Sequence, residues 1–288
     1  MKIFQKGFNY SQDGDGNRLV YHLQGCNMDC PWCANPEGMS IDGVLVTDEE
    51  WLLETVCPRH AILGKNLNRS LCAVCDQKEC ITRHKTKGIR LSYTEQSLTN
   101  IVGEAKANEM MFFDGGGITF TGGEVTMQFA ELSKTLKALK AEGFHTAVET
   151  NGTHGKLPGL FPDIDQLIMD CKFCDLEKQK KYTGVSGDGI LRNIRKAAGK
   201  HPYLHIRVPL IGGVNDDSSD LKLFLEFLRE ISGSNVTFEV LRYHEFGKKK
   251  WEQCGLEYTM TQEAYVSDET YQSFRRAIVE SGGCYKKT

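Results

Sequence analysis

The sequence predicts an α/β fold, an open and partial (β/α)6 barrel with a small cysteine-rich insert. From about Leu91 to the end of the sequence, short apolar segments of strand character alternate with amphipathic stretches. One further strand-like segment lies near the N-terminus, and residues 41–90 combine many charges and cysteines with little periodicity. Alternating strands and helices imply a parallel sheet with crossover helices, for which a doubly wound sheet is the alternative to the barrel.

Six segments have the length and composition of buried strands. They span residues 18–23, 118–121, 145–149, 166–170, 205–209 and 237–241. Between them, two groups of apolar residues each fall on one face of a helix: Leu132, Leu136 and Leu139, and Leu221, Phe224, Leu225 and Leu228. We therefore expect residues 1–40 and 91–288 to form the barrel and residues 41–90 to form the insert.

The composition argues against several classes of protein. The chain has 288 residues, a net charge of −3 and a pI near 6.3. Without a basic excess, nucleic acid is not an expected partner. No apolar run approaches the ~18 residues of a membrane span, and the N-terminus has no signal-peptide pattern. We expect a cytoplasmic protein that does not bind a membrane.

Eleven cysteines are many for a chain of this length. Disulfide frameworks belong to small secreted domains, whereas here the number is odd and seven cysteines fall into two tight groups. Grouped thiols in a cytosolic chain are typical of metal or cluster sites. We expect the four ungrouped cysteines to be free thiols: Cys171, Cys174, Cys254 and Cys284.

The first cysteine group, Cys26, Cys30 and Cys33, has three and then two intervening residues. Such a loop can place its sulfurs around one corner of a cube, so that three irons of a 4Fe–4S cluster are held and the fourth stays open. An open metal position is one where a substrate or cofactor binds directly. The alternative is a structural zinc site, for which His22 is the nearest histidine.

Further chemical side chains follow the predicted strands directly. The segments at the strand ends are Gly25-Cys26, Thr121-Gly122-Gly123-Glu124, Glu149-Thr150-Asn151-Gly152, Asp170-Cys171-Lys172 and Tyr243-His244. In barrels of this type the functional residues lie at the carboxyl ends of the strands. We therefore expect these segments to meet around one site.

The spacing Cys-x3-Cys-x2-Cys after a first strand resembles the signature of the radical S-adenosylmethionine superfamily. Three flanking segments, residues 14–18, 23–26 and 33–37, resemble the activating enzymes of glycyl radical enzymes, a family that includes the pyruvate formate-lyase activating enzyme. The segment from Tyr243 to Lys248 resembles another stretch of that family. The chain departs from the family pattern at Asp15, where proline is usual, and at Asn17, where an aliphatic residue is usual.

The resemblance implies that S-adenosylmethionine is bound along the strand ends. The residues expected to contact it are Trp32, Cys33, Ala34, Asn35, Gly122, Gly123, Glu124, Glu149, Thr150, Asp170, Cys171, Lys172, Arg207 and His244. The Gly-Gly-Glu segment would meet the amino group, since a carboxylate suits an ammonium. Glu149 corresponds to an Asp tied to a monovalent cation, and its extra methylene puts that cation in question. For Asp170 and Lys172, the alternative is an exposed ion pair worth little.

The second cysteine group consists of Cys57, followed by proline, and Cys72, Cys75 and Cys80. In two-cluster ferredoxins a Cys-Pro closes each half, so the segment is ferredoxin-like with one half eroded, and four thiols suffice for one auxiliary 4Fe–4S cluster. A zinc site with four cysteine ligands is the alternative. His60 and His84 are substitutes if a ligand is missing.

The resemblance implies an enzyme of anaerobic metabolism that cleaves S-adenosylmethionine with one electron from flavodoxin or ferredoxin. The 5′-deoxyadenosyl radical formed would take a hydrogen from a backbone glycine of a partner glycyl radical enzyme. One alternative is a radical enzyme acting on another peptide or a small metabolite. A second is an electron carrier or zinc-binding module without catalysis.

Overall fold

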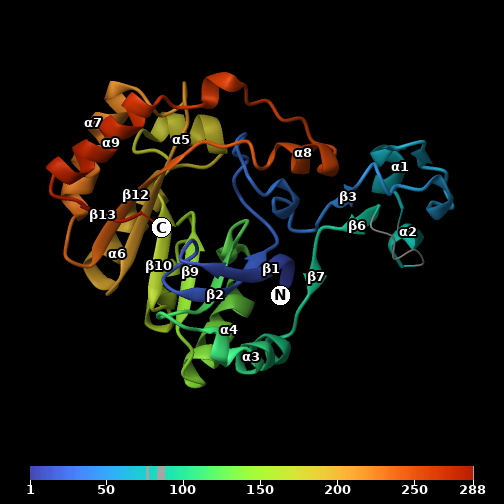
Figure 1. Cartoon of the computed structure of the whole chain (residues 1–288), viewed down its shortest axis with the longest axis horizontal. Coiled ribbons are helices and arrows are strands. Elements are labelled where there is room, and N and C mark those ends of the chain that lie inside the picture. Colours follow the sequence, from blue (N-terminus) through green and yellow to red (C-terminus); the bar gives the residue numbers. More distant parts are fainter. Residues whose placement is uncertain (76–77, 83–87, 288) are drawn as a thin grey trace.

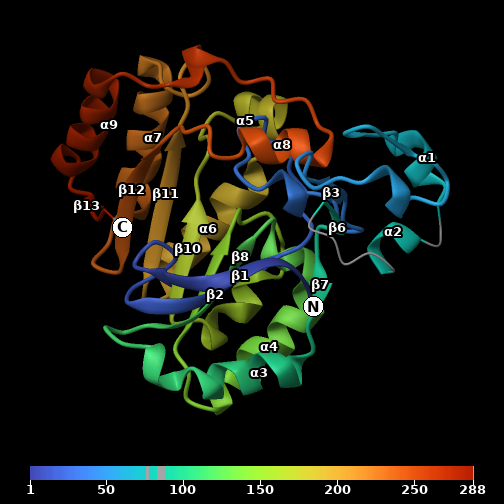
Figure 2. The same ribbon diagram turned by 45° about the vertical axis from the view of Figure 1, so that its right-hand side comes forward.

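A twisted sheet of nine strands forms the centre of the computed structural model, which describes residues 1–75, 78–82 and 88–287 (Figures 1 and 2). From one edge to the other the strands are β13 (Cys284–Tyr285), β12 (Val236–Arg242), β11 (Leu204–Leu210), β10 (Gln166–Asp170), β9 (Thr146–Thr150), β8 (Gly117–Gly122), β2 (Asn17–Leu23), β1 (Lys2–Tyr10) and β7 (Thr94–Glu95). Strands β2 and β8 to β13 are parallel, whereas β1 is antiparallel to both of its neighbours. The six predicted strands are all present, with bounds within one residue of those expected.

The parallel strands follow one another across the sheet in chain order, from β2 through β8 to β13. A doubly wound sheet instead reverses its order near the middle. The predicted mixed α/β fold with a central parallel sheet is therefore confirmed, and the doubly wound alternative is wrong for the described strands.

Helices connect these strands along the outer face of the sheet (Figure 2). They are α3 (Leu98–Ala107), α4 (Phe129–Ala141), α5 (Leu176–Thr183), α6 (Asp188–Lys200), α7 (Ser218–Ile231), α8 (Lys248–Cys254) and α9 (Asp268–Glu280). Single turns of 3-10 helix lie at Pro36–Gly38, Glu54–Val56, Glu109–Met111, Val125–Gln128 and Gln262–Ala264, with a longer one at Leu157–Asp163. Helix α7 begins at an Asp217 cap that accepts hydrogen bonds from the amides of Ser219 and Asp220.

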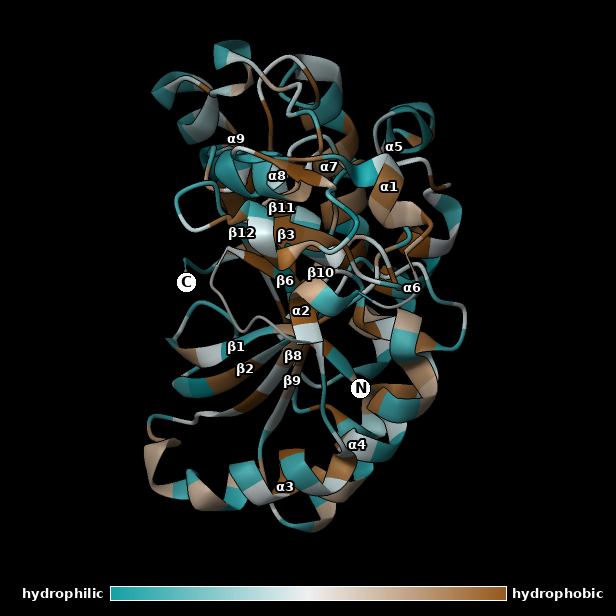
Figure 3. Ribbon diagram, turned by 90° about the vertical axis from the view of Figure 1, so that its right-hand side faces the viewer, coloured by the Kyte–Doolittle hydropathy of each residue, from teal (hydrophilic) through white to brown (hydrophobic). Residues whose placement is uncertain are grey.

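The main core lies between the sheet and these helices, whose ribbons alternate between hydrophobic and hydrophilic residues (Figure 3). The predicted apolar face of α4 is confirmed, since Leu132, Leu136 and Leu139 are completely buried. They pack in one cluster with Phe120 of β8 and Val148 of β9. Burial of each such side chain stabilises the fold by about 2 kcal/mol, so the strand ends above this core are held on a rigid base.

The segment after β2 departs from the sheet and forms a separate small unit beside it (Figure 1). Two hairpin-like pairs lie here, β3 (Leu45–Thr47) with β6 (Ile89–Leu91) and β4 (Ile62–Leu63) with β5 (Asn66–Leu67), together with the short helices α1 (Arg69–Ala73) and α2 (Glu79–Thr82). Its buried residues form a cluster of their own: Leu45, Leu52, Val56, Cys57, Ala61, Ile62, Cys80 and Ile89. Arg69 ties the unit to α8 by donating hydrogen bonds to the carbonyls of Leu45 and Gln253, at 2.6 and 2.8 Å.

Among the described residues, no helix has the length and apolar character needed to cross a membrane.

Candidate active site

One cavity of about 320 Å³ opens at the carboxyl ends of the parallel strands. The predicted residues that line it are Cys26, Cys30, Trp32, Cys33, Ala34, Asn35, Gly122, Gly123, Glu149, Thr150, Asp170, Lys172, Arg207 and His244. They come from the loop after β2 and from the ends of five further strands. Of the predicted cluster and cofactor residues outside the insert, only Glu124 and Cys171 are not among the lining residues.

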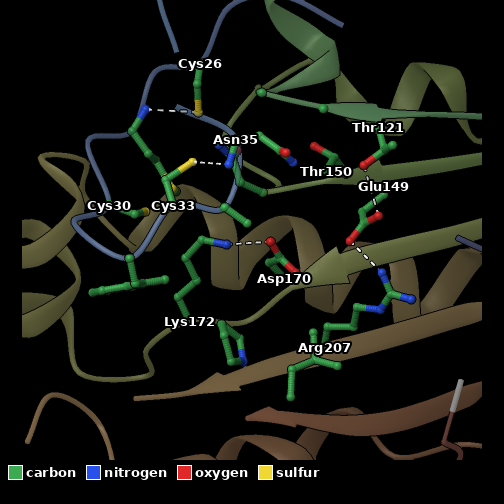
Figure 4. A pocket seen from close by; sticks show the side chains of 18 of the residues that line it. Cys26, Cys30, Cys33, Asn35, Thr121, Glu149, Thr150, Asp170, Lys172 and Arg207 are labelled. Carbon is green, nitrogen blue, oxygen red and sulfur yellow. Dashed lines mark hydrogen bonds and ion pairs between the residues drawn. The ribbon is translucent and has the colours of Figure 1, made fainter. Parts of the chain in front are cut away.

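The three thiols lie on one wall of this cavity, opposite the charged residues (Figure 4). The amides of Met28 and Asn35 donate to the sulfurs of Cys26 and Cys33, each at 3.4 Å. Burial raises the pKa of Cys26 to about 12, an effect that the Lys172 ammonium partly opposes. Metal binding therefore has to displace protons from these thiols.

The donor set of this loop suits an iron–sulfur cluster. Three soft sulfur ligands converge on a cavity whose other walls leave room for a further ligand. Amide donors to the sulfurs are the kind of outer contact that orients and tunes such ligands. Over residues 1–75, 78–82 and 88–287, no three His, Cys, Asp or Glu side chains lie close enough together to hold a single metal ion.

Helix α8 and the turn before it hold the thiol loop in place. The Trp251 indole donates to the carbonyl of Cys33 at 2.8 Å, and Lys250 donates to the side-chain oxygen of Asn35 at 2.8 Å. A Cβ atom at Gly247 would lie 2.5 Å from the Cys33 carbonyl oxygen, so only glycine allows this approach. The segment from Tyr243 to Lys248 thus supports the thiol loop as well as the cavity wall.

Glu124 lies beside the cavity without being among its lining residues, and its contact with an ammonium ligand stays a prediction. It is 1 % exposed and accepts hydrogen bonds from Thr150 Oγ1 and the Asn151 amide, both at 2.7 Å. Thr126 donates to the same carboxylate. Glu124 therefore joins the Gly-Gly turn to the end of β9, while Gly122 and Gly123 lie at the cavity.

Cys171 also points away from the cavity, because successive side chains of a strand face opposite sides of the sheet. It is completely buried in the main core, with its sulfur 3.8 Å from that of Cys174. Its neighbours in the sequence, Asp170 and Lys172, face the cavity.

Asp170 and Lys172 form an ion pair with 2.5 Å between Oδ2 and Nζ, and the two side chains are 23 % and 13 % exposed. The exposed-pair interpretation is therefore wrong. Burial alone would lower the pKa of Lys172, but the charge of Asp170 and its hydrogen bond to Lys172 oppose burial, and the pKa lies above its usual range. Lys172 is a fixed cation between the thiols and the strand ends.

Glu149 and Arg207 form a second buried pair on the far side of the cavity (Figure 4). Arg207 Nη1 lies 2.7 Å from Glu149 Oε1, and Thr121 donates to Glu149 Oε2 at 3.0 Å. The pKa of Arg207 is raised because the Glu149 carboxylate outweighs the effect of burial. The cavity thus contains two acid–base pairs at the ends of neighbouring strands.

At the cavity mouth, His244 stacks on Phe246 with 4.2 Å between ring centroids, and Phe246 itself is 81 % exposed. Burial lowers the pKa of His244, so its ring is neutral near pH 7. A neutral imidazole next to an exposed phenyl ring suits contact with a flat heterocycle or a peptide.

Sequence reasoning missed several lining residues, among them Asp13 and Ile211. Asp13 belongs to the turn between β1 and β2, which no strand-end rule identifies. His22, named in the sequence analysis only as the nearest histidine for a zinc site, is on β2 next to its last residue Leu23 and lines the cavity.

The four cysteines of the insert, Cys57, Cys72, Cys75 and Cys80, line one small cavity together with Pro58, Arg59, Leu71 and Lys78. Burial raises the pKa of Cys72 and of Cys80 above the ordinary thiol value. His60 is not among the lining residues, and His84 lies outside the described residues.

The comparisons with known proteins agree with this geometry. Residues 12–181 match the family model described as a 4Fe-4S single cluster domain. The 4-hydroxyphenylacetate decarboxylase activating enzyme of Clostridioides difficile (strain 630) is 30 % identical, with 95 % of this chain and 92 % of that protein covered. The (2S)-3-sulfopropanediol dehydratase activating enzyme of Klebsiella oxytoca is 30 % identical over 93 % of this chain and 89 % of that protein.

A solved structure supports the fold alone. A radical SAM methyltransferase from Sphaerobacter thermophilus superposes with a TM-score of 0.57 at 12 % identity, covering 97 % of this chain and 67 % of that one. The family match and the cysteine site together define a protein with a 4Fe–4S cluster domain. Within that class, the chain belongs to the activating enzymes of glycyl radical enzymes. The interpretation as an electron carrier or zinc module without catalysis is wrong.

Proposed function

We propose that this chain binds S-adenosylmethionine in the strand-end cavity and that the adenosyl radical formed there takes a hydrogen atom from a backbone glycine of a partner enzyme. The observation that carries the proposal is the meeting of three thiols and two largely buried acid–base pairs around one cavity. The relatives activate decarboxylases and dehydratases, as their names state. The partner would be a glycyl radical enzyme encoded in the same genome as this chain.

Cys26, Cys30 and Cys33 would hold a 4Fe–4S cluster with one iron open to the amino and carboxylate groups of the cofactor. When bound and reduced, the cluster supplies the electron that breaks a carbon–sulfur bond of S-adenosylmethionine. Lys172 offers a permanent cation to the cofactor carboxylate. Gly122 and Gly123 let the cofactor approach the backbone, since no side chain stands in the way.

The remaining residues orient the cofactor and exclude water. Asn35 and Ala34, beside the cluster loop, and Thr150, at the end of β9, form the near wall. Trp32 packs against both Phe173 and Tyr182, which stack on each other; its ring centroid lies 6.1 and 6.2 Å from theirs. His244 closes the mouth as a neutral ring. These roles follow from each residue's place on the cavity wall.

We also propose that the parallel strands form the open (β/α)6 barrel predicted from the sequence, with residues 41–90 as a ferredoxin-like insert holding one auxiliary 4Fe–4S cluster. The strand order and the single cavity lined by Cys57, Cys72, Cys75 and Cys80 support this arrangement. The cluster would relay electrons from flavodoxin or ferredoxin. None of the eleven cysteines, all of which lie among the described residues, is in a disulfide, which suits a reducing compartment, for which we propose the cytoplasm.

Metal analysis of anaerobically reconstituted protein distinguishes the two interpretations of the insert. Two clusters give about eight irons per chain. About four irons with one zinc would contradict the auxiliary cluster while leaving the cavity chemistry intact.

The proposed reaction is tested by isotope transfer. Reduced protein is incubated with S-adenosylmethionine and a candidate glycyl radical enzyme whose glycine is deuterated at the α-carbon. We expect deuterium in the 5′-deoxyadenosine that is released, by mass spectrometry. If deuterium never transfers from any glycyl radical enzyme of the source genome, and instead comes from a deuterated free metabolite, the chain acts on a small molecule.

A further inference from the structure

Arg207 makes more contacts with other residues of the chain than a place on the cavity wall alone requires. Its Nη1 pairs with Glu149 at 2.7 Å, its Nε lies 3.6 Å from Glu239 Oε2, and its Nη2 donates to the Gln12 carbonyl. The side chain is 7 % exposed. The guanidinium is therefore held from three sides and cannot swing away from Glu149 without losing two charge-assisted hydrogen bonds and an ion pair.

The carboxylates at the ends of β9 and β10 both have fixed cationic partners. Glu149 Oε1 pairs with Arg207 and Glu149 Oε2 accepts from Thr121, while Asp170 Oδ2 pairs with Lys172 at 2.5 Å. A monovalent cation at this place would need the same carboxylate oxygens. The site that the family resemblance implies for such a cation therefore does not fit the residues of this chain, because Arg207 already neutralises Glu149.

The length of Glu149 accounts for the pairing. Glu149 is opposite Ile168 on β10, and Arg207 is opposite Asp170, two residues further along. The two side chains meet across β10, and with strands ~4.8 Å apart the pair has to span about 10 Å of sheet. An Asp, shorter by one methylene, would end about 1.5 Å further from the guanidinium.

We infer that Arg207 is the built-in counterpart of the monovalent cation, so that this chain binds and cleaves S-adenosylmethionine without K⁺ or Na⁺. A guanidinium remains charged at every physiological pH and is held by the scaffold. It thus places a positive charge beside the cofactor site, as a bound K⁺ or Na⁺ would, and no ion has to bind first. The inference rests on the proposed function, in that the cavity is taken as the cofactor site, and it makes Arg207 a positioning residue.

The first experiment compares salts on the unmodified holoenzyme. Affinity for S-adenosylmethionine, by calorimetry, and release of 5′-deoxyadenosine are measured in KCl, NaCl and tetramethylammonium chloride at equal ionic strength. We expect agreement within about twofold across the salts, whereas a gain of about tenfold or more with K⁺ overturns the inference. Equal binding in all salts with no cleavage in any would support the inference for cofactor binding and contradict the proposed function, on which the cleavage part of the inference rests.

Variants of Arg207 then remove or keep its positive charge. Arg207→Met keeps the length without the charge, and we expect binding in tetramethylammonium to weaken by about tenfold or more, with part regained in K⁺. Arg207→Lys should stay indifferent to the salt. The control is Arg195→Met, which removes an Arg from an exposed pair with Glu230 (45 % and 50 % exposed) and should bind as the parent does.

Glu149→Asp tests the reach argument directly. The shorter carboxylate should lose its contact with Arg207 and gain a response to K⁺ in both affinity and rate. A folded Arg207→Met protein that binds the cofactor in tetramethylammonium as tightly as the parent overturns the inference. If Arg207→Met does not fold, the salt comparison on the parent and on Glu149→Asp still decides.

Discussion

The two cysteine groups of this protein lie in different surroundings. Cys26, Cys30 and Cys33 share their cavity with the ends of five parallel strands and with two largely buried acid–base pairs. The four insert cysteines share theirs with loop residues and two short helices on a small core of their own. Three thiols beside a charged wall suit an open site that binds a ligand, whereas four thiols suit a closed site for electron transfer.

The largest expected effect separates the two groups. Cys30→Ala removes one of three protein ligands and should abolish cleavage of S-adenosylmethionine. Cys75→Ala should retain cleavage when dithionite supplies electrons, because the insert only relays them. Both are measured as 5′-deoxyadenosine released per chain, with folding checked by circular dichroism. Complete loss in both folded variants would break the comparison, since the insert would then be needed for the chemistry.

The charged wall gives the next effect. Lys172→Met removes a buried cation and leaves Asp170 unpaired, so we expect affinity for S-adenosylmethionine to fall by about 10- to 100-fold. Calorimetry measures it, and Lys172→Arg should recover part of the loss. Lys140→Met, which removes a cation from the pair with Asp165 at the other end of the strands, is the matched control. A Lys172→Met protein with parental affinity would show that the wall does not meet the cofactor.

Support of the thiol loop from outside the cavity gives a smaller effect. Gly247→Ala places a Cβ atom 2.5 Å from the Cys33 carbonyl oxygen, so the loop has to shift and the iron bound at this site should decrease. The control Gly199→Ala, in α6 with no atom within 4 Å of the added carbon, should be neutral or stabilise the fold by about 0.5–1 kcal/mol. Iron content and thermal midpoint are read for both. Full iron content in Gly247→Ala would contradict the role of this turn.

The smallest effect lies at the opposite end of the sheet. Asp165 pairs with Lys140 at 2.6 Å and accepts from the Thr146 amide at 2.8 Å, and these contacts, outweighing burial, lower its pKa. A lowered pKa gives stability that is present above the unfolded-state pKa of about 3.9 and is lost as the pH falls below it. Asp165→Asn should cost about 1–2 kcal/mol at pH 7 and less near pH 3, by urea unfolding. The opposite pH trend would refute it, and cofactor affinity should not change.

Local pattern was sufficient for much of this molecule. Six of the seven parallel strands and the apolar face of α4 follow from hydrophobic periodicity and composition, because burial on both sides of a parallel strand leaves a clear apolar run. Asp170, Lys172 and Glu149 line one cavity, as expected from the rule that functional residues lie at the carboxyl ends of the strands. These predictions depend on neighbours in sequence or on a general property of the fold.

Other features depend on pairings across the sheet, which sequence spacing does not contain. The contact of Arg207 with Glu149 crosses β10, and that of Trp251 with Cys33 joins residues far apart in the chain. Glu124 was expected at the ligand, yet its carboxylate has four internal donors at the foot of the turn. The Gly-Gly-Glu motif identified the correct turn, but the direction of the Glu124 side chain could be known only from the strand register.

The central claim is that the cavity generates a radical that is passed to a backbone glycine. The most direct measurement is the electron paramagnetic resonance spectrum of a partner glycyl radical enzyme after incubation with the reduced protein and S-adenosylmethionine. The account predicts a doublet that collapses to a singlet when the α-carbon of the partner's glycine is deuterated, and that is absent with the Cys30→Ala variant. Formation of 5′-deoxyadenosine with no such signal on any glycyl radical enzyme of the source genome would contradict it.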